Sequence, residues 1–208
     1  MRVRAARPPP TPMLQRALSL HHIRYKSSPP FEFQRLTPNN QEEAAAPPSH
    51  DCVKFEHCVR ARHLIQSGVV RTACERSHWL SEMTGCEIYL KAEHQQFTGS
   101  FKERGARNSL LSLTSSQRSR GVVAASAGNH ALALSWHGTN LGIPVTVVMP
   151  NVAPMAKVDK CRRFGASVVI HGANIGEAKA FAQERFGGLR YINGYDDPEI
   201  IAGTVRMH

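Results

Sequence analysis

The stretch GVVAASAGNHALALSWHGTNLGIPVTVVM, residues 121–149, decides the fold class of this chain. It begins and ends with short valine-rich apolar runs, at 121–126 and 144–149, and such runs bounded by glycine or proline are typical of buried strands. Residues 130–140, between the two runs, predict a helix. Strand, helix and strand in this order and at this spacing predict a βαβ unit with parallel strands.

The same alternation of strand and helix continues on both sides of this stretch. The predicted downstream elements are a helix at 156–164, a strand at 167–170, a helix at 175–186 and a strand at 190–193. The predicted upstream elements are a helix capped by Asp51 and running to about Gln66, a strand at 87–91 and a helix at 104–113. This order predicts the α/β class, with a parallel sheet and helices on both of its faces.

The composition excludes several classes of protein. The chain has 208 residues, 41% of them hydrophobic, and a net charge of +10. Residues 1–50 contribute +4 (seven Lys and Arg against three Glu) and the other residues contribute +6 (nineteen against thirteen), so the charge is spread out and no nucleic-acid partner is expected. The apolar runs are far shorter than the roughly 20 residues that span a bilayer, so no membrane partner is expected.

The cysteines also limit the possibilities. They are five in number and widely spaced, which argues against a disulfide framework and favours a reducing compartment. Histidines and cysteines gather at residues 50–63. They lack the paired spacing of zinc ligands, so no metal site is predicted.

Residues 1–50 differ from the rest of the chain. They contain nine of the thirteen prolines, a density that prevents regular helix or sheet, so a disordered tail is expected. Residues 1–31 hold six Lys and Arg and no acidic residue, which resembles an organellar transit peptide. The proline run fits such a peptide poorly, so a mitochondrial and a cytoplasmic location both stay open.

The loop SAGNHA, residues 126–131, follows a predicted strand and opens a predicted helix. Ligands of parallel sheets bind at the carboxyl ends of the strands, where the N–H groups of a helix N-terminus can face an anion. Gly128 permits close backbone approach, and the side chain of Asn129 both donates and accepts. The loop is a candidate site for a carboxylate or phenolate oxygen. The alternative is an ordinary βα turn capped by Ser126.

A second candidate loop is QQFTGSFKERGARNS, residues 95–109, in which Lys102 stands between a Gly-Ser turn and a predicted helix. Considered alone, a surface lysine in a first helical turn is the ordinary interpretation. The phosphate-binding patterns G-x-G-x-x-G and G-x-x-x-x-G-K-[ST] are absent from the chain. Dinucleotide-binding and P-loop proteins are therefore disfavoured.

Together the two loops resemble a known family. The segment YLKAEHQQFTGSFKERGARNSL (89–110) resembles the Schiff-base segment of fold-type II pyridoxal-phosphate enzymes, and ASAGNHALAL (125–134) resembles their substrate-carboxylate loop. The likeness is greatest to the threonine/serine dehydratases, or ammonia-lyases, and to their relative serine racemase. It runs from about Val53 to Gly203 and includes YINGYDDPEIIAG at 191–203. The resemblance implies a tryptophan synthase β-like fold and the cofactor pyridoxal 5'-phosphate.

The resemblance also assigns roles to residues. Lys102 would bind the cofactor as a Schiff base, beside the bulky Phe101, and would then serve as the base for the α-proton of the substrate. Asn129 would donate a hydrogen bond to the ring oxygen of the cofactor. The substrate carboxylate would be held by Ser126, Ala127, Gly128 and His130.

The implied reaction converts L-threonine or L-serine to a 2-keto acid and ammonia, in a homodimer or larger homo-oligomer. Serine racemase would need a second hydroxyl at the position of Ala127, and a methyl group cannot move a proton, so a dehydratase is favoured and a racemase is the alternative. The sulfhydrylase branch typically has T-S-G-N-T in this loop, from which Ala127 and His130 depart.

Other polar residues near the two loops carry weaker expectations. Thr98 and Ser100 could contribute hydroxyls to the site or satisfy the backbone of their own turn. Glu103 and Arg104 are interpreted as helix-start charges and packing residues. Structural or exposed positions are expected for His94, His137 and His171.

The resemblance stops near residues 201–203, where the family continues with its phosphate loop and the partner of the pyridine nitrogen. We therefore expect a truncated chain with little activity of its own, and the alternative function is that of an inactive isoform or fragment that binds a full-length subunit. The expected domains are a disordered tail at 1–50, the first part of the large cofactor domain at 51–102, a small α/β domain at 103–195 and the start of the return to the large domain at 196–208.

Overall fold

The computed structural model describes residues 53–205. The predictions for Asp51 and for the tail at 1–50 lie outside the described residues. The first described helix, α2 (Phe55–Ile65), follows Lys54 as its N-cap. No helix within the described range is long and apolar enough to cross a membrane.

Four parallel strands form the main sheet, in the order β5–β4–β3–β6. The strands are β3 (Val122–Ala125), β4 (Val145–Met149), β5 (Ser167–Ile170) and β6 (Arg190–Tyr191). Val122 of β3 lies opposite Val145 on one side and opposite Arg190 on the other. The predicted parallel sheet is confirmed, although its last strand is shorter than the predicted 190–193.

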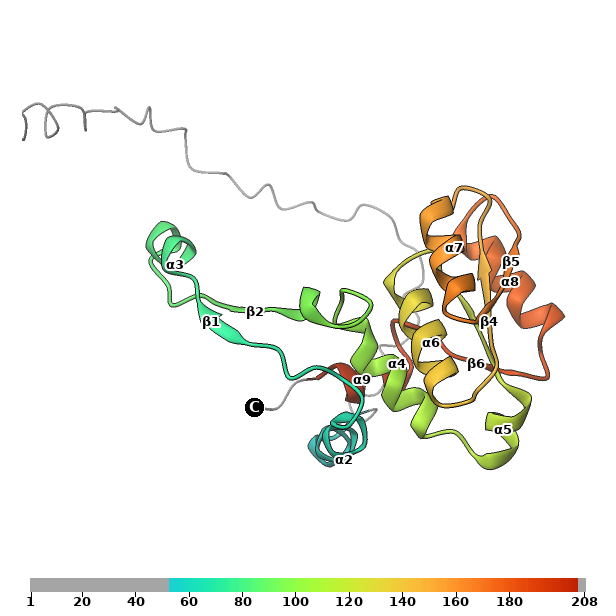
Figure 1. Ribbon diagram of the computed structural model, residues 1–208, viewed down its shortest axis with the longest axis horizontal. Helices are drawn as coiled ribbons and strands as arrows, with labels where there is room; N and C mark the ends of the chain where they lie inside the picture. The colour runs from blue at the N-terminus through green and yellow to red at the C-terminus, as the bar shows by residue number, and fades with distance from the viewer. Residues whose placement is uncertain (1–52, 206–208) are drawn as a thin grey trace, which may run out of the picture. The chain divides into compact units, whose positions relative to one another are not determined.

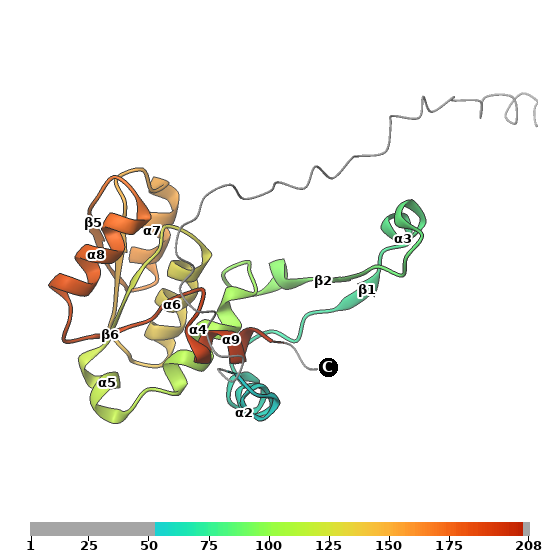
Figure 2. The ribbon, with the colours of Figure 1, turned by 180° about the vertical axis from the view of Figure 1, so that it is seen from behind.

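Helices cover both faces of this sheet, as predicted. α6 (Asn129–Asn140) and α7 (Met155–Arg163) lie on one face, and α8 (Ile175–Arg185) lies on the other (Figures 1 and 2). Val122 and Ala124 pack in the core with α6 and α7, whereas Val123 packs with α8. This division follows from the two-residue period of a strand, which sends alternate side chains to opposite faces.

The helix that begins at the predicted site lysine, α4 (Lys102–Leu111), packs on α6 and on α9 (Pro198–Thr204). Figures 1 and 2 both show α9 between α2 and α4. A Cβ atom on Gly105 would lie 2.7 Å from the Ile200 carbonyl oxygen, and one on Gly203 would lie 2.7 Å from the Arg104 carbonyl oxygen. The two helices therefore touch backbone to backbone where their glycines meet.

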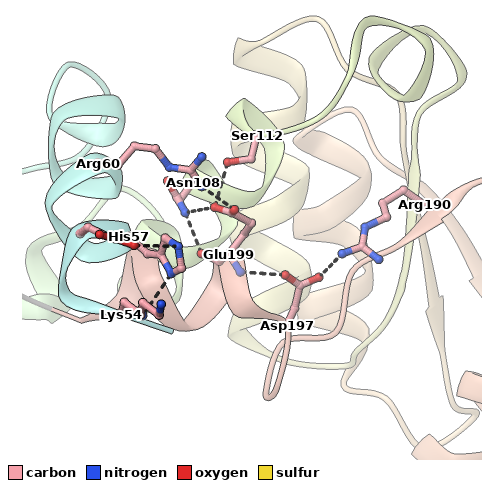
Figure 3. Close-up of polar contacts among 9 residues, drawn as sticks. Lys54, His57, Arg60, Asn108, Ser112, Arg190, Asp197 and Glu199 are labelled. Carbon is pink, nitrogen blue, oxygen red and sulfur yellow. Dashed lines mark hydrogen bonds and ion pairs between the residues drawn. The ribbon is translucent and has the colours of Figure 1, made fainter. Parts of the chain in front are cut away.

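Polar contacts centred on Glu199 hold α9 in place (Figure 3). One carboxylate oxygen of Glu199 accepts from Arg60 of α2 at 2.6 Å. The other accepts from Asn108 and Ser112 at 2.8 and 2.9 Å. Asp197 caps the N-terminus of α9 by accepting the Glu199 N–H at 3.0 Å. Glu199 thus joins three helices that are far apart in sequence.

The predicted strand at 87–91 is present, but it does not belong to the parallel sheet. β2 (Tyr89–Lys91) pairs antiparallel with β1 (Cys74–Arg76), and α3 (His78–Thr84) connects the two. The sequence analysis missed β1 and α3. The residues of β1 are Cys-Glu-Arg and all three are exposed, so no apolar alternation marks the strand.

The helix predicted at 104–113 begins and ends two residues earlier, at Lys102–Leu111. Its predicted end was wrong because Thr114 caps a further short helix, α5 (Ser115–Arg120), through a capping box with Gln117. The short 3-10 helix η1 (Glu93–Gln95) and α9 were also not predicted. Lys102 consequently lies in the first turn of a helix and not in the loop before it.

Candidate active site

Lys102 follows a turn that glycine makes possible. Gly99 has a φ of 84°, a left-handed conformation that glycine adopts without strain. The Lys102 Nζ donates a hydrogen bond to the Gly194 carbonyl oxygen at 2.6 Å. It lies 5.4 Å from the ring centroid of Phe101 and 5.1 Å from that of Tyr195. Burial lowers the pKa of Lys102, which brings the amine nearer to the neutral form that a nucleophile or base needs.

The loop after β3 leads through Ser126 and Ala127 to Gly128, the N-cap of α6. The Gly128 N–H donates to Ser126 Oγ at 3.3 Å, so the hydroxyl satisfies the loop's own backbone, but the cap of α6 is Gly128 and not Ser126. No atom lies within 4 Å of the position that a Cβ on Gly128 would take. The positive N-terminus of α6 therefore has open space beside it, and this space suits an anion.

The segment 192–195, directly after β6, joins the two candidate loops. The Ile192 carbonyl oxygen lies 3.3 Å from His130 Nε2, and the Gly194 carbonyl oxygen accepts from Lys102. A Cβ on Gly194 would lie 2.7 Å from His130 Cγ, so glycine is needed where the segment crosses the imidazole. Because β6 pairs in parallel with β3, the carboxyl ends of both strands lie at one edge of the sheet. This edge brings Lys102 and His130 together.

His130 is a buried, neutral side chain. Its pKa is lowered to about 4, chiefly by burial and further by the charge of Lys102. With the Nε2–H group donating to Ile192, the buried Nδ1 has no partner among residues 53–205. The imidazole therefore brings no positive charge to an anion near pH 7, and its backbone N–H is the group available for that role.

Asn129 is held by a residue that the sequence analysis did not select. Its Oδ1 accepts a hydrogen bond from Lys157 Nζ of α7 at 3.1 Å. This contact orients the amide and leaves the Nδ2 donors for another acceptor. Within the described range, no hydrogen bond joins Lys102 to the loop at 126–129.

The residues around Lys102 are more buried than expected. Thr98 Oγ1 and Ser100 Oγ are buried and have no hydrogen-bond partner in the described part of the chain, so they do not satisfy their own turn. Arg104 is 9% exposed and binds Glu93 through two contacts, of 2.8 and 2.9 Å. Glu103 is fully buried. Both Glu103 and Arg104 are thus interior residues, which agrees with the packing part of the interpretation, and Arg104 pairs with Glu93.

The remaining histidines divide as the sequence analysis allowed. His94 and His171 are exposed. His137 is fully buried in α6, and its Nε2 lies 3.3 Å from Glu103 Oε2.

Comparison with known proteins identifies the family of this chain. Residues 65–207 match the model of the pyridoxal-phosphate dependent enzymes. The chain belongs to this family. It is 45% identical over 154 residues to the L-threonine ammonia-lyase of Thermotoga maritima, a match that covers 73% of this chain and 38% of that protein.

Two solved structures extend the comparison. The processed form of threonine deaminase isoform 2 from Solanum lycopersicum has a TM-score of 0.66 and 34% identity, over 76% of this chain and 44% of that one. Maize serine racemase has a TM-score of 0.69 and 30% identity, over 73% and 47%. The chain thus spans less than half the length of each of these three relatives. The predicted family and fold-type II architecture are confirmed.

The residues present fit pyridoxal phosphate, the cofactor of the family. Lys102 offers an amine with a lowered pKa beside an aromatic ring. Ser100 Oγ and His130 Nδ1 are buried polar atoms without a partner among residues 53–205. Asn129 has its amide donors available, and Gly128 opens the loop to a neighbouring group.

Gly194, Tyr195 and Lys157 are candidate site residues that the sequence analysis missed. They follow β6 and β4, the two strands that flank β3. Ligands bind at the carboxyl ends of parallel strands, and these ends share one edge of the sheet, so the segments after β4 and β6 were candidates for the same reason as SAGNHA. The rule could not be applied without knowing which strands are neighbours.

Proposed function

We propose that these residues carry the lysine and the carboxylate loop of a pyridoxal-phosphate-dependent L-threonine or L-serine ammonia-lyase. The observation that carries the proposal is the position of Lys102, a partly buried amine with a lowered pKa beside Phe101, linked through Gly194 and His130 to the start of α6. The names of two relatives, an ammonia-lyase and a deaminase of threonine, support this reaction type.

The roles of this chain's residues follow from their positions. Bound pyridoxal phosphate supplies a ring that withdraws electrons from the α-carbon of the substrate. Lys102, tethered at the start of α4, would remove the α-proton, and the α-proton and the β-hydroxyl would together leave as water. Backbone N–H groups from Ala127 to His130 would hold the substrate carboxylate, and Asn129 Nδ2 would hold the ring oxygen of the cofactor.

A racemase is the second candidate, because maize serine racemase has the same fold over most of this chain. A racemase must return a proton to the opposite side of the α-carbon. Ala127, in the carboxylate loop, has no group that can donate one. The loop therefore favours elimination over racemisation.

Mapping the reactive lysine tests the proposed site. The purified chain is incubated with pyridoxal phosphate, reduced with borohydride and digested. We expect a pyridoxyl group on the peptide of Lys102, and its loss in Lys102→Met. The lysines Lys91 and Lys157 are internal controls, since label on either in place of Lys102 would refute the assignment.

Product analysis separates the candidate activities. Keto acid and ammonia from L-threonine or L-serine indicate an ammonia-lyase, whereas D-serine from L-serine indicates a racemase. A chain that is labelled at Lys102 but yields none of these products supports the alternative of an inactive chain that binds a full-length subunit. Adding such a subunit and measuring co-sedimentation then tests that binding.

The domain division at residues 51, 103 and 196, the homo-oligomer and the compartment are part of the same proposal. Four exposed apolar side chains near the β1–β2 ribbon support a partner surface: Trp79, Met83, Tyr89 and Leu90. Sedimentation velocity tests self-association. A fluorescent fusion to residues 1–50 distinguishes a mitochondrial from a cytoplasmic location.

A further inference from the structure

A buried carboxylate stands next to Lys102 in the sequence. Glu103 has no exposed surface, and its Oε1 accepts a hydrogen bond from the Thr98 backbone N–H. Its Oε2 lies 3.3 Å from His137 Nε2, in an orientation that makes no hydrogen bond. His137 is equally buried, in the last turn of α6. One side chain therefore contacts the turn before the lysine and the helix that begins at the carboxylate loop.

Burying the Glu103 carboxylate costs free energy, so we expect Glu103 to have a role other than stabilising the fold. Moving a carboxylate out of water is unfavourable, and a buried ion pair is often no more stable than two apolar residues of similar volume. Ala106 and Leu110 of α4 and Leu134 of α6 belong to one apolar core. Apolar side chains would fill this space, but they could not bind the Thr98 N–H.

An aromatic contact lies beside the polar one. The rings of Phe97 and Trp136 have centroids 5.5 Å apart. Phe97 directly precedes Thr98, and Trp136 directly precedes His137. The lysine loop thus meets α6 directly through Phe97 and, through Glu103, at the next residue of each segment, which sets where the turn from Thr98 to Phe101 lies.

We propose that Glu103 and His137 are positioning residues that fix Lys102 relative to the N-terminus of α6. The carboxylate closes the turn at Thr98, and the turn delivers the Lys102 amine to the Gly194 carbonyl oxygen. The contact with His137 holds the same carboxylate to the helix that carries Asn129 and His130. This inference rests on the proposed function of Lys102 as the cofactor lysine.

The test measures the Lys102 amine directly, without cofactor. The 208-residue chain is acetylated by competitive labelling over a range of pH, and the Lys102 peptide is followed by mass spectrometry with Lys157 as the internal reference. The double variant Glu103→Leu/His137→Leu removes both members of the Glu103–His137 pair. We expect the midpoint of the curve of Lys102 labelling against pH to move to higher pH, because the amine becomes less buried. Each unit of this shift lowers the neutral fraction at a given pH about tenfold.

Two variants separate positioning from stability. Glu103→Gln keeps an oxygen for the Thr98 N–H, and we expect it to retain the wild-type midpoint. Leu134→Ala destabilises α6 by removing an apolar side chain of the same helix, and we expect it to lower the thermal midpoint without moving the labelling of Lys102. A shift in Leu134→Ala as large as in the double variant would refute the proposal.

Glu103→Asp covers the case in which the double variant does not fold. It keeps the charge but is one methylene too short to reach both partners, so the Lys102 midpoint should again move upward. A wild-type midpoint in the folded double variant or in Glu103→Asp would overturn the positioning role. The proposed function fails by a different result, the absence of pyridoxyl label on Lys102 of the wild-type chain.

Discussion

Burial lowers the pKa of both Lys102 and His130, and the charge of Lys102 adds to the effect at His130. Burial is the main cause at both side chains, but the consequences differ. A lower pKa increases the fraction of Lys102 that is a neutral, reactive amine. The neutral imidazole of His130 is an uncharged packing group. Glycine is required at position 194 for this packing around His130, because any side chain there would meet the imidazole ring.

The stability of the chain should depend on pH through His130. Its pKa is about 4 in the folded chain and about 6.5 when unfolded, so the unfolded state binds more protons between these values. The contribution is fully present above about pH 6.5 and is lost as the pH falls towards about 4, a loss of about 3 kcal/mol. Urea unfolding at several pH values should show a smaller loss in His130→Gln.

The matched control is His171→Gln, which changes an exposed histidine. It should keep the wild-type pH dependence. If His130→Gln kept it as well, the buried neutral imidazole would not be the source of the effect.

Among the elements, α9 shows how helices from distant parts of the sequence are fixed together. α9 packs closely on α4 where Gly105 and Gly203 leave room for the backbones, and Glu199 of α9 makes polar contacts with Arg60 and Asn108 (Figure 3). The two kinds of contact can be tested separately.

Gly105→Ala should push α4 and α9 apart. The added Cβ would lie 2.7 Å from the Ile200 carbonyl oxygen and from Thr204 Oγ1, too close for either to remain in place. We expect a net loss of about 1–2 kcal/mol in the free energy of unfolding, because overpacking outweighs the roughly 1 kcal/mol by which alanine favours a helix. Gly188→Ala, where nothing lies within 4 Å, should change it by less than about 0.5 kcal/mol in the same urea titration.

Glu199→Ala should lower the free energy of unfolding by about 2 kcal/mol, since a carboxylate that accepts from Arg60, Asn108 and Ser112 is removed. Asp159→Ala is the control. Asp159 pairs with Arg162 at 3.8 Å on the exposed side of α7, and its loss should cost no more than about 0.5 kcal/mol. Equal effects of the two substitutions in thermal or urea unfolding would contradict the role of Glu199.

At the scale of the whole described chain, the two sheets differ in how well they are supported. β3 lies between two strands and is covered by helices on both faces. The β1–β2 ribbon has two strands of three residues, most of them exposed. Isolated two-stranded pairs are marginal in water, so the ribbon should open far more readily than the parallel sheet.

Hydrogen exchange followed by mass spectrometry should show this difference. We expect slow exchange in peptides of β3 and β4 and fast exchange in peptides of β1 and β2, with α4 closer to the parallel sheet because it packs on α6. Protection of β1 and β2 as strong as that of β3 would show that the ribbon is covered, for example by self-association.

Much of the fold could be predicted from contiguous residues. The strand at 167–170 has its predicted bounds, and the helix predicted at 130–140 begins one residue earlier. These elements can be predicted because their apolar residues recur with the period of a helix or a strand. β1 gives no such signal, and α5 depends on the cap at Thr114. The loops of Lys102 and of Ser126 to His130 were likewise recognisable as local motifs.

The tertiary structure alone decided what surrounds those motifs. Gly194 and Lys157 lie next to the candidate residues Lys102 and Asn129 because β6 and β4 lie on either side of β3, and no local pattern states the order of strands. Glu103 stands in a first helical turn, where a sequence suggests an exposed charge, yet it is buried where α4 packs on α6, 3.3 Å from His137. A sequence records the period of each element, but burial and pKa depend on which elements pack together.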